Sequence, residues 1–110
     1  MMQEISTTEE WDEILDQSNE KPVLMMKHSS TCPVSASAFS AFQRTETNLS
    51  KYYLIVQKSR PLSQEIEREL QIRHESPQLF LLKDGKAVWK ASHYAIMEPS
   101  ITKAIQEHQV

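Results

Sequence analysis

The sequence predicts an α/β domain in which a mixed four-stranded sheet is flanked by helices. Three observations support this prediction. Helical and extended patterns alternate along the chain, the apolar run at residues 23–28 suits a buried central strand, and a strong turn at residues 83–86 joins two apolar segments. The chain has 110 residues, 39% hydrophobic and 25% charged, which is typical of one globular domain covering residues 1–110.

The N-terminal segment predicts a helix followed by a buried strand. Thr7 and Glu10 have the spacing of a capping box, in which each side chain accepts a backbone N–H of the other residue. The helix that they open carries apolar residues on one face and should stop near residues 18–19. Pro22 then introduces the strand at residues 23–28.

A longer helix is predicted from Pro33, because proline is favoured at the first helical position, where its missing N–H costs nothing. This assignment makes Cys32 the N-cap residue and extends the helix roughly to Asn48. A second apolar strand follows at residues 52–56, and it should be parallel to the first because a helix connects the two. The buried stripe of the helix is expected to contain Val34, Ala38, Ala41, Phe42, Thr45 and Leu49.

The second half of the chain changes character. Pro61 opens a further helix, and Ser76–Pro77 precedes a strand predicted at residues 78–82. The turn at residues 83–86 makes the next strand, at residues 87–91, antiparallel to that one. A final helix carries on its apolar face Ile101, Ala104 and Ile105.

Composition and cysteine count argue against several classes of function. A net charge of −3 lacks the basic face of a nucleic-acid-binding protein. No apolar run is long enough to span a bilayer and no signal-peptide pattern opens the chain, so we expect a cytoplasmic protein without a membrane partner. The single cysteine permits neither an internal disulfide nor a dithiol pair. No metal site is expected, because ligand spacing is missing among His28, His74, His93 and His108.

The functional interpretation depends on Cys32. Only the thiolate of a cysteine is strongly nucleophilic. At a helix N-cap the sulfur faces unsatisfied backbone N–H groups and the positive end of the helix dipole, and both favour the anion. Ser35 lies one helical turn further on and could donate its hydroxyl to the thiolate. Lys27 and His28 precede the turn and could add positive charge.

These residues also have a plainer interpretation. An unpaired cytoplasmic cysteine is most often a small buried hydrophobe. The position of Cys32 between a polar turn and Pro33 favours a reactive thiol instead. His28 and His93 are interpreted as structural rather than catalytic residues.

Three segments of the chain carry a resemblance to a known family: the pentapeptide Thr31–Ser35 (Thr-Cys-Pro-Val-Ser), Ser76–Pro77 and residues 91–93. In these segments the chain resembles the monothiol bacilliredoxins of Firmicutes, which have a thioredoxin-like fold. It implies a cis peptide bond that turns the Ser76 backbone toward the thiolate, whereas a trans proline at a strand start is the ordinary alternative. The implied roles are catalysis by Cys32, thiolate stabilisation by Pro33 and Ser35, and substrate binding by Thr31, Ser76 and Pro77.

The same resemblance implies a reaction, the removal of bacillithiol from S-bacillithiolated client proteins through a mixed disulfide on Cys32. Dithiol glutaredoxins have a second cysteine at the position of Ser35, so here an outside thiol must resolve the intermediate. Gly85 is the only glycine, so the chain lacks the glycine-rich patch of many glutathione-dependent glutaredoxins. That difference favours bacillithiol as the co-substrate thiol, and no tightly bound cofactor is expected.

Two alternatives belong to other classes of protein. The first is an iron–sulfur carrier, in which one cysteine from each of two chains and two external thiols hold the cluster. Monothiol glutaredoxins of that kind have glycine where this chain has Pro33, which would hinder the ligand loop. The second is a non-enzymatic adaptor that keeps the fold and leaves Cys32 buried and unactivated.

Overall fold

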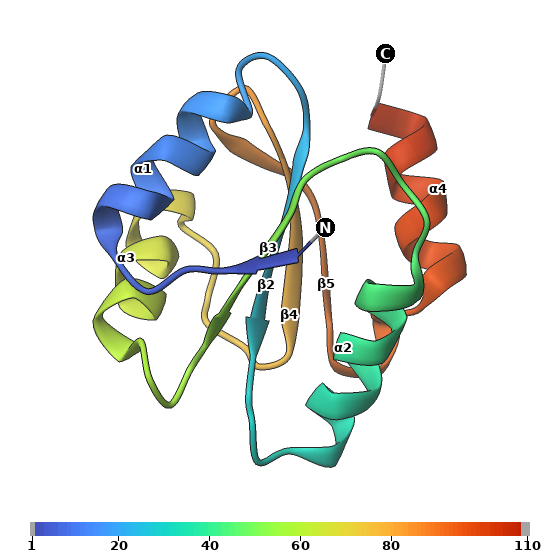
Figure 1. Ribbon diagram of the computed structural model, residues 1–110, viewed down its shortest axis with the longest axis horizontal. Helices are drawn as coiled ribbons and strands as arrows, with labels where there is room; N and C mark the ends of the chain where they lie inside the picture. Colours follow the sequence, from blue (N-terminus) through green and yellow to red (C-terminus); the bar gives the residue numbers. More distant parts are fainter. Residues whose placement is uncertain (1, 109–110) are drawn as a thin grey trace.

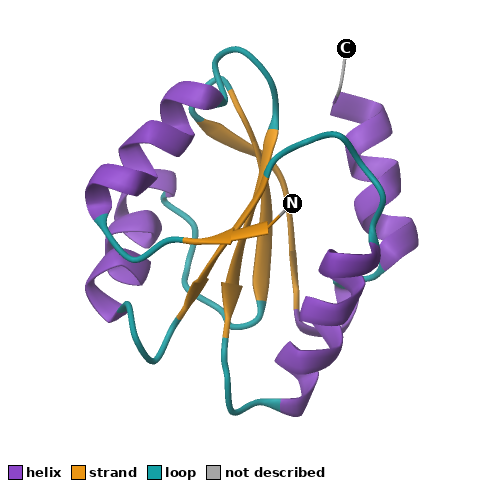
Figure 2. Cartoon of the chain, in the orientation of Figure 1, coloured by secondary structure: helices purple, strands orange, loops and turns teal. Residues whose placement is uncertain are grey.

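The computed structural model describes residues 2–108, which form a five-stranded sheet between two layers of helices (Figures 1 and 2). The strands are β1 (Met2–Glu4), β2 (Val23–His28), β3 (Lys51–Ile55), β4 (Gln78–Lys83) and β5 (Lys86–Ser92). The helices are α1 (Thr8–Gln17), α2 (Pro33–Arg44), α3 (Arg60–Leu70) and α4 (Glu98–His108), with a short 3-10 helix at His93–Ala95.

The strand order β1-β3-β2-β4-β5 places β2 at the centre of the sheet. Strand β2 is parallel to β3, and β4 and β5 form an antiparallel hairpin, as the sequence predicts. The two halves of the sheet meet where β2 pairs antiparallel with β4. Helices α1 and α3 cover one face of the sheet and α2 and α4 cover the other (Figure 1). Because side chains alternate along a strand, β2 contributes to both cores: Val23 and Met25 face α1 and α3, while Leu24 and Met26 face α2 and α4.

The predicted four-stranded sheet is wrong by one strand. Residues Met2–Glu4 form β1, which pairs in parallel with β3, with Met2 opposite Lys51. This edge strand has only three residues, which are too few to show the alternation of apolar and polar residues that predicts a strand. All three are partly or fully exposed. The pairing depends on the neighbouring strand, and it continues as the Ile5 N–H donates to the Tyr53 carbonyl at 2.8 Å.

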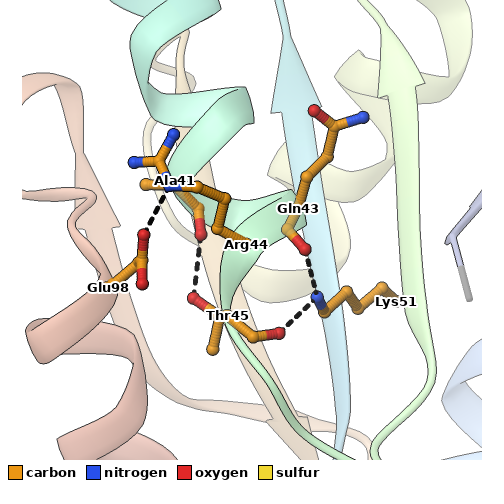
Figure 3. A network of polar contacts seen from close by, with 6 residues as sticks. All are labelled: Ala41, Gln43, Arg44, Thr45, Lys51 and Glu98. Atoms are coloured by element: carbon orange, nitrogen blue, oxygen red, sulfur yellow. Dashed lines mark hydrogen bonds and ion pairs between the residues drawn. The ribbon is translucent and has the colours of Figure 1, made fainter.

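Helix α2 ends at Arg44 and not near Asn48, which corrects the predicted boundary. Thr45 has extended backbone angles and terminates the helix. Figure 3 shows the reason: the Lys51 ammonium, from the first residue of β3, donates to the carbonyl of Gln43 at 3.2 Å and to that of Thr45 at 2.6 Å. These bonds satisfy carbonyls that the end of a helix would otherwise leave unpaired.

The buried stripe of α2 also differs from the prediction at its first position. Val34 is half-buried, and Ser35 is fully buried in its place. Thr45 and Leu49 are buried as predicted, although both lie beyond the end of the helix. The remaining predicted members are buried within it: Ala38, Ala41 and Phe42.

Local signals in the sequence are confirmed where they set the ends of elements. Thr7 caps α1, and its hydroxyl and the Glu10 carboxylate each accept a backbone N–H of the other residue at 3.1 Å. At the β4–β5 turn, Asp84 and Gly85 both have positive φ, 53° and 74°. Two consecutive residues in that region fit the tight turn that the right-handed twist of a hairpin favours.

Within residues 2–108, no helix is long and apolar enough to cross a membrane. The same part of the chain holds no group of three or more His, Cys, Asp or Glu side chains placed to bind a metal ion.

Candidate active site

Cys32 lies at the junction between the central strand and α2, as predicted. It is the N-cap residue, with extended backbone angles (φ −107°, ψ 122°), and Pro33 follows at the first helical position. The first helical hydrogen bond runs from the Ala36 N–H to the Cys32 carbonyl at 3.0 Å. The cysteine is partly exposed and its side chain makes no capping hydrogen bond. This partly exposed residue therefore lies beside first-turn N–H groups that have no helical acceptor.

Ser35 is the buried polar side chain beneath this helix terminus. It is 0% exposed. Its Oγ accepts the Ser29 N–H at 2.8 Å and lies 2.8 Å from Nδ1 of His28. Both of these hydrogen bonds tie the start of α2 to the end of β2. Neither goes to the Cys32 sulfur, so the predicted donation to the thiolate stays a prediction.

The imidazole of His28 is held between Ser35 and an aromatic ring. It stacks on Phe39 with centroids 4.3 Å apart and an interplanar angle of 13°, and Phe39 packs edge-on against Tyr53 at 4.9 Å. Burial lowers the pKa of His28 below its ordinary value. The ring is therefore mainly neutral at pH 7, which argues against the suggestion that His28 supplies positive charge beside the thiolate.

Lys27 lies on the opposite face of the sheet from His28, as neighbouring strand residues must. Its side chain is 0% exposed, and the ammonium donates to the Ser63 carbonyl at 3.0 Å and to Nδ1 of His74 at 3.1 Å. Burial lowers the pKa of Lys27 to about 8, although the charge of Glu67 opposes this shift. The lysine is thus bound on the α3 side of the sheet, away from the α2 side on which Ser35 and His28 meet.

The turn that leads into Cys32 is held by Gln57, which follows β3. The Gln57 amide donates to the hydroxyls of Ser29 at 2.8 Å and Thr31 at 3.2 Å. Its carbonyl oxygen accepts the Ser30 N–H at 3.1 Å. Sequence reasoning missed Gln57. The available signal was its position just after a strand parallel to β2, because the carboxyl ends of parallel strands lie at one edge of a sheet.

The structure brings Ser76–Pro77 to the same end of the sheet as Cys32. Gln78 pairs with Lys27 in the antiparallel β2–β4 register, so Pro77 comes opposite His28 one residue further along. The Ser76–Pro77 peptide bond is cis, which confirms that expectation. Pro77 is buried, and Ser76 Oγ is buried with no hydrogen-bond partner among residues 2–108.

A further segment at this end was not predicted, the 3-10 helix at His93–Ala95. The His93 N–H donates to the Pro77 carbonyl at 3.0 Å, and the residue adopts a left-handed backbone with φ 54°. Glu75 accepts the Ser92 hydroxyl at 3.3 Å and lies 3.9 Å from the His93 ring. The segment thus connects β5 to the Ser76–Pro77 loop, and it is followed by the exposed Met97.

Comparisons with known proteins agree with this arrangement. A family model described as monothiol bacilliredoxin BrxC matches residues 3–101. One solved structure, described as a candidate oxidoreductase with a thioredoxin fold, has 35% sequence identity and a TM-score of 0.87, and the match covers 94% of this chain and 92% of that chain.

Two thioredoxins are more distant and show the fold alone. The Malassezia sympodialis thioredoxin has 16% identity and a TM-score of 0.78, over 100% of this chain and 92% of its own. The Nicotiana alata thioredoxin has 17% identity and a TM-score of 0.76, over 99% and 93%. Because the family model spans most of the sequence and the solved structures share its architecture, this chain has the thioredoxin fold and belongs to the monothiol bacilliredoxin family.

Proposed function

We propose that this protein is a monothiol oxidoreductase that removes bacillithiol from S-bacillithiolated proteins. Family membership and the likeness to a thioredoxin-fold oxidoreductase support a thiol redox function. The observation that carries the finer proposal is the single, partly exposed Cys32 at the N-terminus of α2. A thiolate there can attack a disulfide, and no second cysteine is present to complete an internal exchange.

The first step is attack by the Cys32 thiolate on the bacillithiol sulfur of the mixed disulfide. A bond forms between the Cys32 sulfur and bacillithiol, and the bond between bacillithiol and the client cysteine breaks. The client sulfur leaves with the electron pair and takes a proton from water. Disulfide bonds are conserved in number, so this step requires no other oxidant or reductant.

The second step regenerates Cys32. A second bacillithiol, as its thiolate, attacks the bacillithiol sulfur of the adduct, and Cys32 leaves as a thiolate. The product is bacillithiol disulfide, and the electrons that later reduce it come from outside this chain. Groups that stabilise the thiolate therefore assist this second step, in which Cys32 is the leaving group.

The client segment is proposed to dock beside the Ser76–Pro77 loop. The β2–β4 register supports this position, because it brings Pro77 to the strand end that precedes Cys32. Backbone groups of Ser76 could pair with an extended client segment. Thr31, which is exposed next to Cys32, would contact the same segment.

The activity test uses one client protein carrying bacillithiol in one sample and glutathione in the other, each with the matching free thiol. We expect the native protein to release bacillithiol at least about tenfold faster than glutathione, and Cys32→Ser to release neither faster than the free thiol does alone. Mass spectrometry of the client measures both rates and the rate without protein. Equal rates would contradict the bacillithiol preference, and release by Cys32→Ser above the rate without protein would contradict the role of Cys32.

A further inference from the structure

The buried hydroxyl of Ser35 can make a limited set of hydrogen bonds. A serine hydroxyl donates one proton and accepts up to two. One acceptor position is used by the Ser29 N–H at 2.8 Å. The bond to His28 Nδ1, also 2.8 Å, uses either the hydroxyl proton or the second acceptor position. The state of the imidazole ring therefore decides where the Ser35 proton points.

In the neutral ring with its proton on Nε2, Nδ1 is an acceptor and takes the Ser35 hydroxyl proton. In the imidazolium, both ring nitrogens carry protons, so Nδ1 donates to Ser35 instead. Ser35 then accepts from both His28 and Ser29, and its own proton is released. The sulfur of Cys32 is the acceptor that we infer for this proton, because Cys32 is the N-cap residue and Ser35 is the third helical residue, the two positions whose side chains lie beside each other in a capping box.

We propose that His28 is a positioning residue that controls the Ser35 hydroxyl proton and thereby the stability of the Cys32 thiolate. The inference rests on the proposed role of Cys32 as the attacking thiolate. Neutral His28, with its proton on Nε2, holds the hydroxyl proton away from the sulfur. Loss of this acceptor, or its protonation, frees the proton to donate to the thiolate.

The surroundings of His28 favour this role over a purely electrostatic one. The ring stacks on Phe39 and its burial lowers its pKa, so near neutral pH it acts on Ser35 as a hydrogen-bond acceptor rather than as a charge. Lys27 projects to the other sheet face, toward Ser63. The other ionisable side chains of the neighbouring elements are Cys32, which precedes α2, and Arg44 at the end of that helix. Strand β3 carries Lys51, Tyr52 and Tyr53, and Glu75 and His93 lie beside Pro77.

The consequence applies to both steps of the proposed reaction. A hydroxyl that donates to sulfur stabilises the thiolate as nucleophile and as leaving group. A hydroxyl held by His28 does not stabilise the thiolate. Removing the His28 acceptor while keeping an aromatic ring against Phe39 should therefore stabilise the thiolate relative to the thiol. Removing a positive charge would have the opposite effect.

The variant that makes this distinction is His28→Phe, which keeps the ring stack and removes Nδ1. We expect the pH midpoint of the Cys32 thiolate absorbance to fall by about one unit, because a hydrogen bond to a charged group has roughly this effect. Ser35→Ala alone should leave the midpoint close to its native value, because the hydroxyl that it removes is held by His28 and does not donate to the sulfur. In the Ser35→Ala background, His28→Phe should change nothing further, since the hydroxyl through which it acts is gone.

The matched control is His108→Phe, at the C-terminal end of α4, which Figure 1 places far from the start of α2. It should leave the midpoint unchanged. An unchanged or raised midpoint in His28→Phe, or an equal fall in the Ser35→Ala background, would overturn the proposal. The readout uses no bacillithiol, so a failure of the proposed substrate would leave this result intact.

A second measurement needs no substitution. Nitrogen-15 NMR of labelled histidine in the native protein should show neutral His28 with its proton on Nε2 and a hydrogen-bonded Nδ1 acceptor. A neutral ring protonated on Nδ1 would contradict the proposal, because Ser35 would then already have a free hydroxyl proton.

Discussion

Ser35→Cys should convert a stable bacillithiol adduct into an internal disulfide. The native protein, mixed with bacillithiol disulfide and no reductant, should acquire one adduct, on Cys32. In the variant, the new thiol lies one helical turn from Cys32, at a Cα separation that a disulfide can span. It should displace bacillithiol, and the product should be about two mass units lighter than the reduced variant, one hydrogen for each sulfur.

Ser37→Cys is the matched control for this experiment. Ser37 is exposed on α2, five residues beyond Cys32 and on another part of the helix surface. Its variant should keep the adduct on Cys32, and intact-mass spectrometry with peptide mapping separates the products. A native protein that forms no adduct at all would show that Cys32 is not a nucleophile for this disulfide, and the proposed function would fail with it.

Lys27→Met should stabilise the protein at neutral pH by about 1–3 kcal/mol. At pH 7 the ammonium is mostly charged, and its burial makes that charge costly, which is why the pKa of Lys27 falls to about 8. Methionine fills a similar volume without a charge. The hydrogen bond between Ser63 Oγ and His74 Nδ1, at 3.2 Å, can remain when the lysine is removed.

The pH dependence of this effect has a definite sign. Between about pH 8 and 10.5, the unfolded chain still holds the Lys27 proton while the folded chain releases it. The unfolded state then binds more protons, so the free energy of unfolding of the native protein rises with pH across this window. The advantage of Lys27→Met should be full below pH 8 and disappear toward pH 10.5.

Urea unfolding of the native protein and Lys27→Met at several pH values measures both effects. Burial also lowers the pKa of Lys51, which adds a slope of the same sign to both proteins, so only the difference between them reports on Lys27. Lys86→Met, which replaces an exposed lysine in the β4–β5 hairpin, should show no comparable difference. A Lys27→Met protein that is less stable at pH 7 would show that the ammonium contributes more by its hydrogen bonds than its burial costs.

The parts of the fold that the sequence predicted correctly depend on residues close together in the chain. The Thr7–Glu10 capping box, Pro33 at the first turn of α2 and the turn at Asp84 and Gly85 each specify a local backbone geometry. The errors arose where a distant element decides the outcome. Helix α2 stops at Arg44 because Lys51 of β3 takes its last carbonyls, and β1 depends on an edge of β3.

The same distinction between neighbouring residues and distant elements applies to the candidate site. The N-cap position of Cys32 follows from its neighbours in sequence, whereas the burial of Ser35 was not predicted, because Val34 was assigned to the buried stripe instead. The partners of Ser35 could not be predicted, since the bond to His28 depends on how β2 packs against α2. Gln57 reaches the turn from another strand, so no motif near Cys32 indicates it.

Helix α2 is fastened to the sheet at both ends. Ser35 joins its first turn to the end of β2, and Lys51 joins its last carbonyls to the beginning of β3. Because hydrogen bonds hold both of its ends, the helix has one orientation on the sheet, and its N-terminal dipole has a fixed direction relative to the strands. In the proposed reaction, this fixed direction would preorganise the environment of the sulfur, because the dipole is oriented during folding rather than during each turnover. We expect the reduced protein and its thiol adduct to share one backbone, with the exchange rate limited by the chemistry of the two sulfurs and not by a conformational change.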